Sequence, residues 1–344
     1  MTAILCEGLT KHYGTVVGLQ DLDLAVPDGA VFGFLGSNGA GKTTTIKLLT
    51  GLSRPTSGRA SVASYDVTAG NTEMRARIGY LAEEPAFYGW MTGEEFLTFV
   101  GRLFGLRGGD LARRVREVLE VADLGPAARR RIGGYSRGMR QRLGIAHALI
   151  NQPSVLLLDE PCSALDPMGR KEVLEVIEHL RGQTTVFMST HILADVERVC
   201  DTVGIIDHGK IVAQASIEAL RERYAGPVFV IEFEAAPEPV SALADHLQQQ
   251  PWVASAEASE GQLRLYARDL AFARQTLPPL VIASGMTLLR YELTAPSLED
   301  VFVHLTSASA LTSASALTSS SALTSSSGLA SAPSEMSDAA EARQ

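Results

Sequence analysis

The sequence predicts an α/β fold with a parallel sheet, followed by a smaller α+β domain. Three observations lead to this prediction: short apolar runs, helical segments between them, and a glycine-rich loop after the first run. The apolar runs cover residues 31–35, 155–158, 185–188 and 203–206. Apolar runs that alternate with helices are typical of strands buried on both faces of a parallel sheet. We expect this pattern to extend from Ile4 to about residue 225.

The glycine-rich loop has the spacing G-x-x-x-x-G-K-[ST] of a cradle for nucleotide phosphates. Its residues are Gly36, Ser37, Asn38, Gly39, Ala40, Gly41, Lys42 and Thr43, and Thr44 continues into the helix. Glycines let backbone N–H groups close around phosphates, Lys42 adds a positive charge, and the Thr43 hydroxyl suits Mg²⁺. The alternative is a glycine-rich turn with a surface lysine. The order strand, loop, helix favours the triphosphate site, because the start of a helix attracts anions.

The apolar run at 155–158 ends in two acids, Asp159 and Glu160. Asp159 is placed to hold Mg²⁺ directly or through water, and Glu160 to polarise an attacking water as a general base. A strand that simply ends in surface acids is the alternative. The phosphate loop upstream favours the catalytic interpretation.

Beyond residue 226 the pattern changes to that of a small accessory α+β domain. The expected elements are a strand at 228–234, a helix at 239–249, a hairpin of 252–258 and 262–267, a helix near 269–277, a strand near 286–293 and a short helix at 297–305. The order β-α-β-β-α-β, up to that last helix, is the split βαβ arrangement.

A hexapeptide such as TSASAL repeats four times from Thr306 to Leu329. Each repeat carries no charge and one leucine, which is too little apolar surface to offset the entropy of ordering the chain. We therefore expect residues 306–344 to form a disordered tail, with a docking segment as the alternative.

Composition limits the partners of this 344-residue chain, of which 46% is hydrophobic. The net charge of -9 argues against broad attraction to nucleic acid or to an anionic membrane surface. Cys6, Cys162 and Cys200 are odd in number and lack metal-ligand spacing, which fits a reduced, cytosolic compartment. No apolar stretch approaches the roughly 18 to 20 residues that span a bilayer, so we expect any role at a membrane to require a partner.

The segment Tyr135-Ser136-Arg137-Gly138-Met139-Arg140-Gln141-Arg142 lies between the loop and the acidic pair. With it, the chain resembles the ATP-binding subunits of ABC transporters, whose signature is close to Leu-Ser-Gly-Gly-Gln. The resemblance covers residues 4–225 and implies a P-loop NTPase of the ABC ATPase type. Such a fold has a RecA-like core sheet and a helical subdomain, here at 85–150. The implied domains are 1–226 for the ATPase, 227–305 for the accessory domain and 306–344 for the tail.

The same resemblance implies roles for single residues. Ser136 and Gly138 match the positions that grip the γ-phosphate of ATP held on the other monomer, which implies a head-to-tail homodimer. Tyr13 matches the aromatic residue that stacks on adenine. Asp166 matches the loop residue that communicates between the two sites, and His191 matches the switch histidine that contacts the γ-phosphate.

Two residues depart from the family pattern. Glu83 stands where the family usually has glutamine; it still offers an oxygen to Mg²⁺ but lacks the amide donor. Arg137 replaces the first signature glycine. We expect its side chain to point away from the phosphate, and the alternative is a rearranged grip with a slower ATPase.

A membrane partner is also implied by resemblance. Phe87, Tyr88, Gly89, Trp90 and Met91 follow Glu83 where family members receive the membrane subunit, and the alternative is that these aromatics fill the chain's own core. The signature, together with the segment 297–305, looks like ABC-2-type exporters, whose membrane subunit chooses the substrate.

The resemblance thus implies an ATP- and Mg²⁺-dependent ATPase on the cytoplasmic face of the membrane. Its dimerisation would power export through a separate permease, with Glu160 and His191 in catalysis. Two alternatives stay open: a soluble ABC protein acting on the ribosome or DNA, and a regulatory subunit that binds ATP without turnover. The first tends to have two phosphate loops or a long coiled coil, and this chain has neither.

Overall fold

The computed structural model describes residues 1–69, 72–163, 165–224 and 228–294. The larger sheet has six strands in the order β10-β9-β3-β8-β7-β6. These are β3 (Val31–Leu35), β6 (Ile78–Leu81), β7 (Val155–Asp159), β8 (Thr185–Thr190), β9 (Thr202–Asp207) and β10 (Lys210–Ser216). The strands from β9 to β6 are parallel and β10 is antiparallel to β9. The four expected strands are all present, and the α/β class is confirmed.

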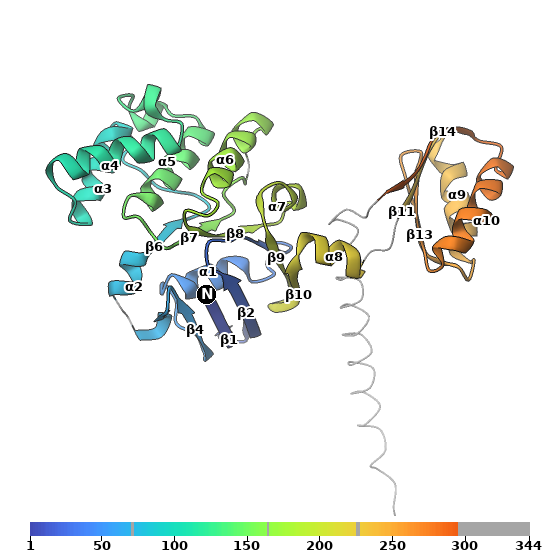
Figure 1. Ribbon diagram of the computed structural model, residues 1–344, viewed down its shortest axis with the longest axis horizontal. Helices are drawn as coiled ribbons and strands as arrows, with labels where there is room; N and C mark the ends of the chain where they lie inside the picture. Colours follow the sequence, from blue (N-terminus) through green and yellow to red (C-terminus); the bar gives the residue numbers. More distant parts are fainter. Residues whose placement is uncertain (70–71, 164, 225–227, 295–344) are drawn as a thin grey trace, which may run out of the picture. The chain divides into compact units, whose positions relative to one another are not determined.

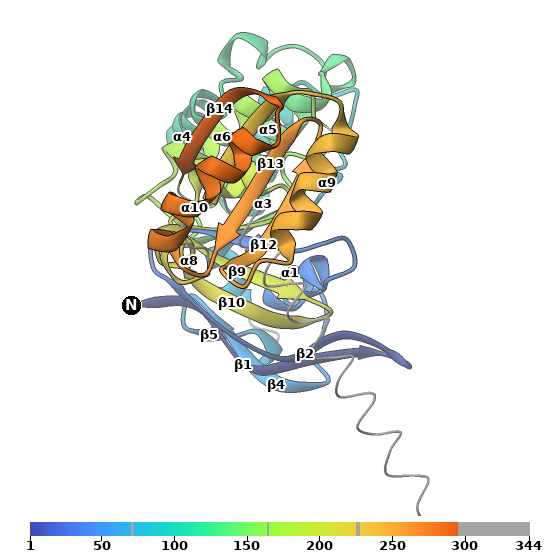
Figure 2. The same cartoon turned by 90° about the vertical axis from the view of Figure 1, so that its right-hand side faces the viewer.

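A second, antiparallel sheet has the order β2-β1-β4-β5. Its strands are β1 (Thr2–Tyr13), β2 (Val16–Pro27), β4 (Ser57–Val62) and β5 (Tyr65–Asp66), and Figure 2 shows β1, β2 and β4 side by side. Our sequence prediction missed this sheet. Its strands alternate buried and exposed residues and carry register shifts, so they offer no continuous apolar run.

The helices of this part pack on both faces of the six-stranded sheet. They are α1 (Lys42–Leu49), α2 (Thr72–Arg77), α3 (Gly93–Leu103), α4 (Gly108–Val121), α5 (Arg137–Leu149), α6 (Pro167–His179), α7 (Leu193–Val199) and α8 (Ile217–Tyr224). Figure 1 shows α1 between the two sheets and α3 to α6 on the other side. Successive residues of β7 divide between the two cores: Val155 and Leu157 pack toward α1, and Leu156 and Leu158 toward α5 and α6.

The segment from 228 to 294 has its own core. It comprises β11 (Val228–Glu234), α9 (Pro237–Gln248), β12 (Val253–Ser259), β13 (Gln262–Ala267), α10 (Leu270–Ala283) and β14 (Thr287–Thr294). The sheet order is β12-β13-β11-β14, all antiparallel, with both helices on one face (Figure 1). The expected element order is confirmed over these residues.

Two expectations fall outside the described residues, namely the short helix at 297–305 and the repeats from Thr306 onward. Among the helices that the structure describes, none combines the length and apolar character needed to cross a bilayer.

Candidate active site

A cavity of about 480 Å³ lies at the carboxyl end of β3, where the glycine-rich loop leads into α1. Its lining includes many of the predicted site residues: Tyr13, Asn38, Gly39, Gly41, Lys42, Thr43, Thr44, Glu83, Glu160 and His191. Segments far apart in the sequence therefore meet here. The ends of parallel strands are the usual place for a ligand in an open α/β sheet.

Close packing shapes the loop at both ends. Gly41 has φ +111°, and a Cβ there would lie 2.7 Å from the carbonyl oxygen of Gly18. A Cβ on Gly36 would lie 2.5 Å from the carbonyl oxygen of Ile206 on β9. Both positions therefore require glycine. Ala40 is buried and its carbonyl accepts from the Gly209 N–H at 2.9 Å, which ties the loop to the turn between β9 and β10.

Lys42 lies at the centre of the cavity wall. Its side chain is 5% exposed, and Nζ donates to the carbonyl oxygens of Gly36 at 2.7 Å and Ser37 at 3.0 Å. Nζ also lies 3.1 Å from Glu160 Oε1, as an ion pair without hydrogen-bond alignment. The cation is thus fixed beside the helix start, where a phosphate group would be attracted by both.

Asp159 ends β7 and is 2% exposed. Its Oδ1 accepts from Ser189 Oγ at 2.7 Å and from Thr43 Oγ1 at 3.3 Å. Burial raises the pKa of this carboxyl, while the two hydroxyl hydrogen bonds act in the opposite direction. A buried carboxylate whose charge lacks solvation is a favourable place for a cation.

Glu160 follows directly and has an unusual backbone, with φ +48°. Its N–H is held by Ser189, through the carbonyl at 3.2 Å and Oγ at 3.0 Å. Its Oε2 lies 2.9 Å from Nδ1 of His191, which follows β8. A non-glycine residue in this conformation is strained by about 1 to 2 kcal/mol, and such strain occurs preferentially at functional sites. The backbone and both carboxylate oxygens are therefore constrained.

A partly buried ion pair joins α6 and α7 near His191. Asp195 on α7 is fully buried, and its Oδ1 accepts from Arg170 Nε of α6 at 2.5 Å. Burial raises the Asp195 pKa, and the hydrogen bond to Arg170 opposes that rise. Our sequence prediction missed this pair and the role of Ser189. Ser189 stands on β8, two residues before His191, but nothing in the sequence connects Arg170 with Asp195.

Tyr13 lies at the rim of the cavity and is 48% exposed. Lys11 Nζ lies 5.0 Å from its ring centroid, and a Cβ on Gly18 would lie 3.0 Å from Tyr13 Cε2. Lys11 is itself held by the carbonyl oxygen of Arg54 at 2.7 Å. These contacts restrict the orientation of the ring while it stays partly exposed, as stacking on a base requires.

The residues at the cavity fit a nucleotide with Mg²⁺. No side chain caps α1 and no acid lies in its first turn, among the residues the structure describes, so its N-terminal end favours an anion. Thr43, Asp159 and Glu83 supply the oxygen ligands that Mg²⁺ prefers. No cluster of three or more His, Cys, Asp and Glu side chains able to hold a metal occurs in the described part of the chain.

Seven predicted residues are not part of the cavity lining: Gly36, Ser37, Ala40 and Asp159 belong to the loop and the strand end next to it, and Ser136, Gly138 and Asp166 lie at the starts of α5 and α6. Ser136 caps α5, accepting from the Met139 N–H at 3.1 Å, and Asp166 caps α6, accepting from the Gly169 N–H at 3.3 Å. A Cβ on Gly138 would lie 3.5 Å from Cα of Gly169, so the two helix starts lie side by side. Arg137, next to Ser136, is exposed.

The aromatic segment at 87–91 divides between core and surface. The Phe87 ring packs edge-on against Phe96 of the core, with centroids 5.1 Å apart. Tyr88 and Trp90 are 53% and 70% exposed, and Tyr88 also contacts the exposed Phe99. The core interpretation therefore holds for Phe87, while Tyr88 and Trp90 lie on the surface. We call Tyr88, Trp90 and Phe99 the aromatic patch.

Two protein families match this chain. Residues 19–163 match the ABC transporter family, and residues 216–306 match the C-terminal domain of DrrA1-3-like ATP-binding proteins. A solved structure described as the ATP-binding subunit of an ABC transporter is 30% identical, with a TM-score of 0.59. It covers 65% of this chain and 93% of its own. The expected ABC ATPase fold is confirmed.

Relatives match over nearly the full length. The bacitracin transport ATP-binding protein BcrA of Bacillus licheniformis is 34% identical, across 90% of this chain and 99% of its own. The daunorubicin resistance ATP-binding protein DrrA2 of Streptomyces coeruleorubidus is 38% identical, across 88% of this chain and 95% of its own. The chain therefore belongs to the family of ABC transporter ATP-binding proteins, which are ATPases.

Proposed function

We propose that this chain is the ATP-hydrolysing subunit of a membrane exporter. The observation that carries the proposal is the meeting of Lys42, Glu160 and His191 in one cavity. Glu160 is the general base for an attacking water, because its carboxylate is held at both oxygens beside the phosphate-binding lysine. His191 orients Glu160 through the 2.9 Å contact. Lys42 neutralises charge on the outer phosphates.

The remaining cavity residues bind the nucleotide. Residues 36–44 cradle the phosphates and Tyr13 stacks on the adenine. When Mg²⁺ is bound, Thr43, Asp159 and Glu83 hold it, and the ion withdraws negative charge from the phosphates.

The site is completed by a second copy of the chain. Ser136 and Gly138 lie outside the cavity lining, at the start of α5. We assign them to the γ-phosphate of ATP on the partner copy, in a head-to-tail homodimer. Asp166 stands beside them at the start of α6, where it can link the two sites.

A membrane permease, encoded as a separate chain, is the proposed partner. The aromatic patch exposes three rings on the helical subdomain, proposed here as residues 85–150 of an ATPase domain at 1–226. Exposed aromatic clusters are typical of protein interfaces. The accessory domain is assigned to 227–305, and the chain is placed on the cytoplasmic face of the membrane.

The direction of transport is proposed from the relatives. One is named for bacitracin transport and one for daunorubicin resistance, and the C-terminal match is to a DrrA-like domain. Export of a substrate chosen by the permease fits these names. A ribosome- or DNA-associated ATPase is not favoured, because relatives that match 90% and 88% of this chain are named for transport and for drug resistance.

The decisive experiment compares the wild type with Glu160→Gln, and with Glu178→Gln as an exposed control on α6. Steady-state ATP hydrolysis should be lost in Glu160→Gln alone. Light scattering with ATP and Mg²⁺ should find that variant trapped as a dimer. Equal, measurable hydrolysis by all three proteins would contradict the role of Glu160. No hydrolysis by any of them, with the permease present, would contradict the proposal and favour a regulatory subunit.

A further inference from the structure

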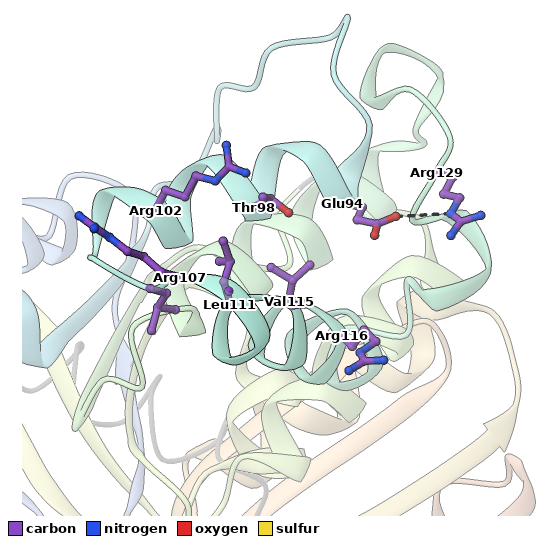
Figure 3. A pocket seen from close by; sticks show the side chains of 11 residues that line it. Glu94, Thr98, Arg102, Arg107, Leu111, Val115, Arg116 and Arg129 are labelled. Carbon is purple, nitrogen blue, oxygen red and sulfur yellow. Dashed lines mark ion pairs between the residues drawn. The ribbon is translucent and has the colours of Figure 1, made fainter.

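A groove of about 820 Å³ lies between α3 and α4, outside the candidate active site (Figure 3). Leu106, Leu111 and Val115 give it an apolar lining. Leu111 and Val115 lie one helical turn apart on α4 and are buried, so this part of the lining is fixed by the core. On α3, Thr98 and Arg102 have the same spacing and face the groove from the other side.

Arginines surround this apolar lining. Arg102 comes from α3, Arg107 directly precedes α4, Arg116 lies on α4, and Arg129 follows in the chain (Figure 3). Arg129 Nε lies 3.5 Å from a carboxylate oxygen of Glu94. The other three guanidinium groups make no hydrogen bond or ion pair within the described part of the chain.

These three arginines differ from two others on α4, which are paired with acids. The chain as a whole carries a net charge of -9, and neighbouring arginines such as Arg113 and Arg114 pair with acids on their own helix. Three unpaired cations around one groove repel one another, and Glu94, the one acid of the lining, is paired with Arg129. An anionic partner would remove the repulsion.

The apolar lining decides which kind of anion fits. A bare phosphate would use the arginines alone, whereas an acidic segment of a protein can place carboxylates against guanidinium groups and apolar side chains on Leu106, Leu111 and Val115. The volume suits several side chains at once.

We propose that the groove between α3 and α4 binds an acidic, amphipathic segment of a partner protein, with Arg102, Arg107 and Arg116 reading its carboxylates. The groove would then be a second contact surface for the partner, in addition to the aromatic patch. Its positive charge would select a partner whose segment is acidic. The inference rests on the proposed function only in taking that partner to be the membrane permease.

The test uses the full chain and a defined probe. The probe is a fluorescein-labelled stapled helical peptide with glutamates on one face and leucines on the other, and its match carries glutamines in place of the glutamates. Fluorescence anisotropy compares the wild type with the triple variant Arg102→Gln, Arg107→Gln, Arg116→Gln. A control triple variant, Arg54→Gln, Arg59→Gln, Arg75→Gln, removes the same charge from exposed positions outside the groove.

The glutamate peptide should bind the wild type and the control equally well. It should bind the groove variant about tenfold more weakly, the loss expected for three exposed ion pairs. Added salt should weaken this binding. A triple change to glutamate at the same positions should reverse the preference toward a lysine peptide. Equal binding to groove variant and control, or no binding of the glutamate peptide, would overturn the proposal.

Two further arms identify a different anion. Competition by inorganic phosphate alone, or binding to phosphatidylglycerol vesicles in place of the peptide, would overturn the proposal in favour of a phosphate or lipid site. ATP hydrolysis by the groove variant should equal that of the wild type. If the wild-type chain binds the peptide but hydrolyses no ATP, the proposed function is wrong and the assignment of the groove still holds.

Discussion

Ser189 joins the two acidic residues of the site. Its hydroxyl donates to Asp159 Oδ1 at 2.7 Å and accepts from the Glu160 N–H at 3.0 Å. One buried side chain on β8 thus fixes both a proposed metal ligand and the backbone of the proposed base. This contact explains how Glu160 keeps its left-handed conformation.

Ser189→Ala should reduce ATP turnover by about 10- to 100-fold, because a hydrogen bond to a charged group contributes about 1.5 to 3 kcal/mol. Nucleotide affinity should change less, since the phosphate loop is untouched. Steady-state hydrolysis checks the first and calorimetric titration the second. Ser163→Ala is the control, because Ser163 also lines the cavity but has no side-chain bond to either acid among the described residues. Wild-type turnover in Ser189→Ala would show that the contact is not needed.

Glu83 places a carboxylate in the cavity lining, where it faces the nucleotide phosphates of the proposed complex. Glu83→Gln should therefore raise the affinity for ATP in EDTA by several fold, through loss of one repulsive charge. The gain should shrink with Mg²⁺, which the carboxylate helps to hold. Titration of a fluorescent ATP analogue with and without the metal measures this difference. Glu84→Gln, one residue away and outside the lining, should change neither value.

The positions of site residues were predictable where a short motif carries them. Lys42, Asp159 and Glu160 stand in fixed spacing within one loop and one strand end, and the structure brings them together. Arg170 and Asp195 were not predictable, because they are 25 residues apart and on separate helices. Only the packing of α6 against α7 makes them a pair.

Elements were predictable according to how they are buried. β3, β7 and β8 are buried along their whole length, and each contains a run of consecutive apolar residues. β1 and β2 bury one face only and contain bulges, so their alternation is interrupted. The elements of the accessory segment were predictable because Pro251, Gly261 and Gly285 mark three of the turns between them.

The stability of the packing between α5 and α3 should depend on pH. The His147 ring on α5 lies edge-on to Phe96 of α3, with centroids 5.6 Å apart, and burial lowers its pKa below the ordinary 6.5. As the pH falls, His147 therefore binds its proton at a higher pH in the unfolded chain than in the folded chain. The stability that depends on a neutral His147 is therefore fully present above the ordinary pKa of 6.5. It is lost as the pH falls from there toward the lower pKa of His147 in the folded chain.

His147→Gln should reduce the loss of Tm between about pH 7.5 and about pH 5.5, because the buried imidazole no longer opposes protonation. Thermal melting at the two pH values measures the effect. His179→Gln, an exposed histidine at the end of α6, is the control and should behave as the wild type. An unchanged pH dependence in His147→Gln would show that other groups dominate.

The whole chain combines folded parts with a repetitive end. Truncation after Leu305 removes the four repeats, and it should leave both Tm and ATP hydrolysis unchanged, because each repeat carries a single leucine and no charge. Calorimetry and a steady-state assay on the shortened chain test this. A Tm lower by several degrees would show that the repeats pack on the folded parts.

Each copy of the chain carries the phosphate loop in its cavity and Ser136 at a separate helix start. Two inactive proteins should then rescue each other in the proposed homodimer. When Lys42→Ala and Ser136→Arg are mixed, one site of each mixed dimer receives both defects and the other receives none. Activity should return to about a quarter of wild type if mixing is random and the sites act independently, because half of the dimers are mixed. No recovery would mean that both sites must be intact at once, which would make the two ATP molecules a single functional unit.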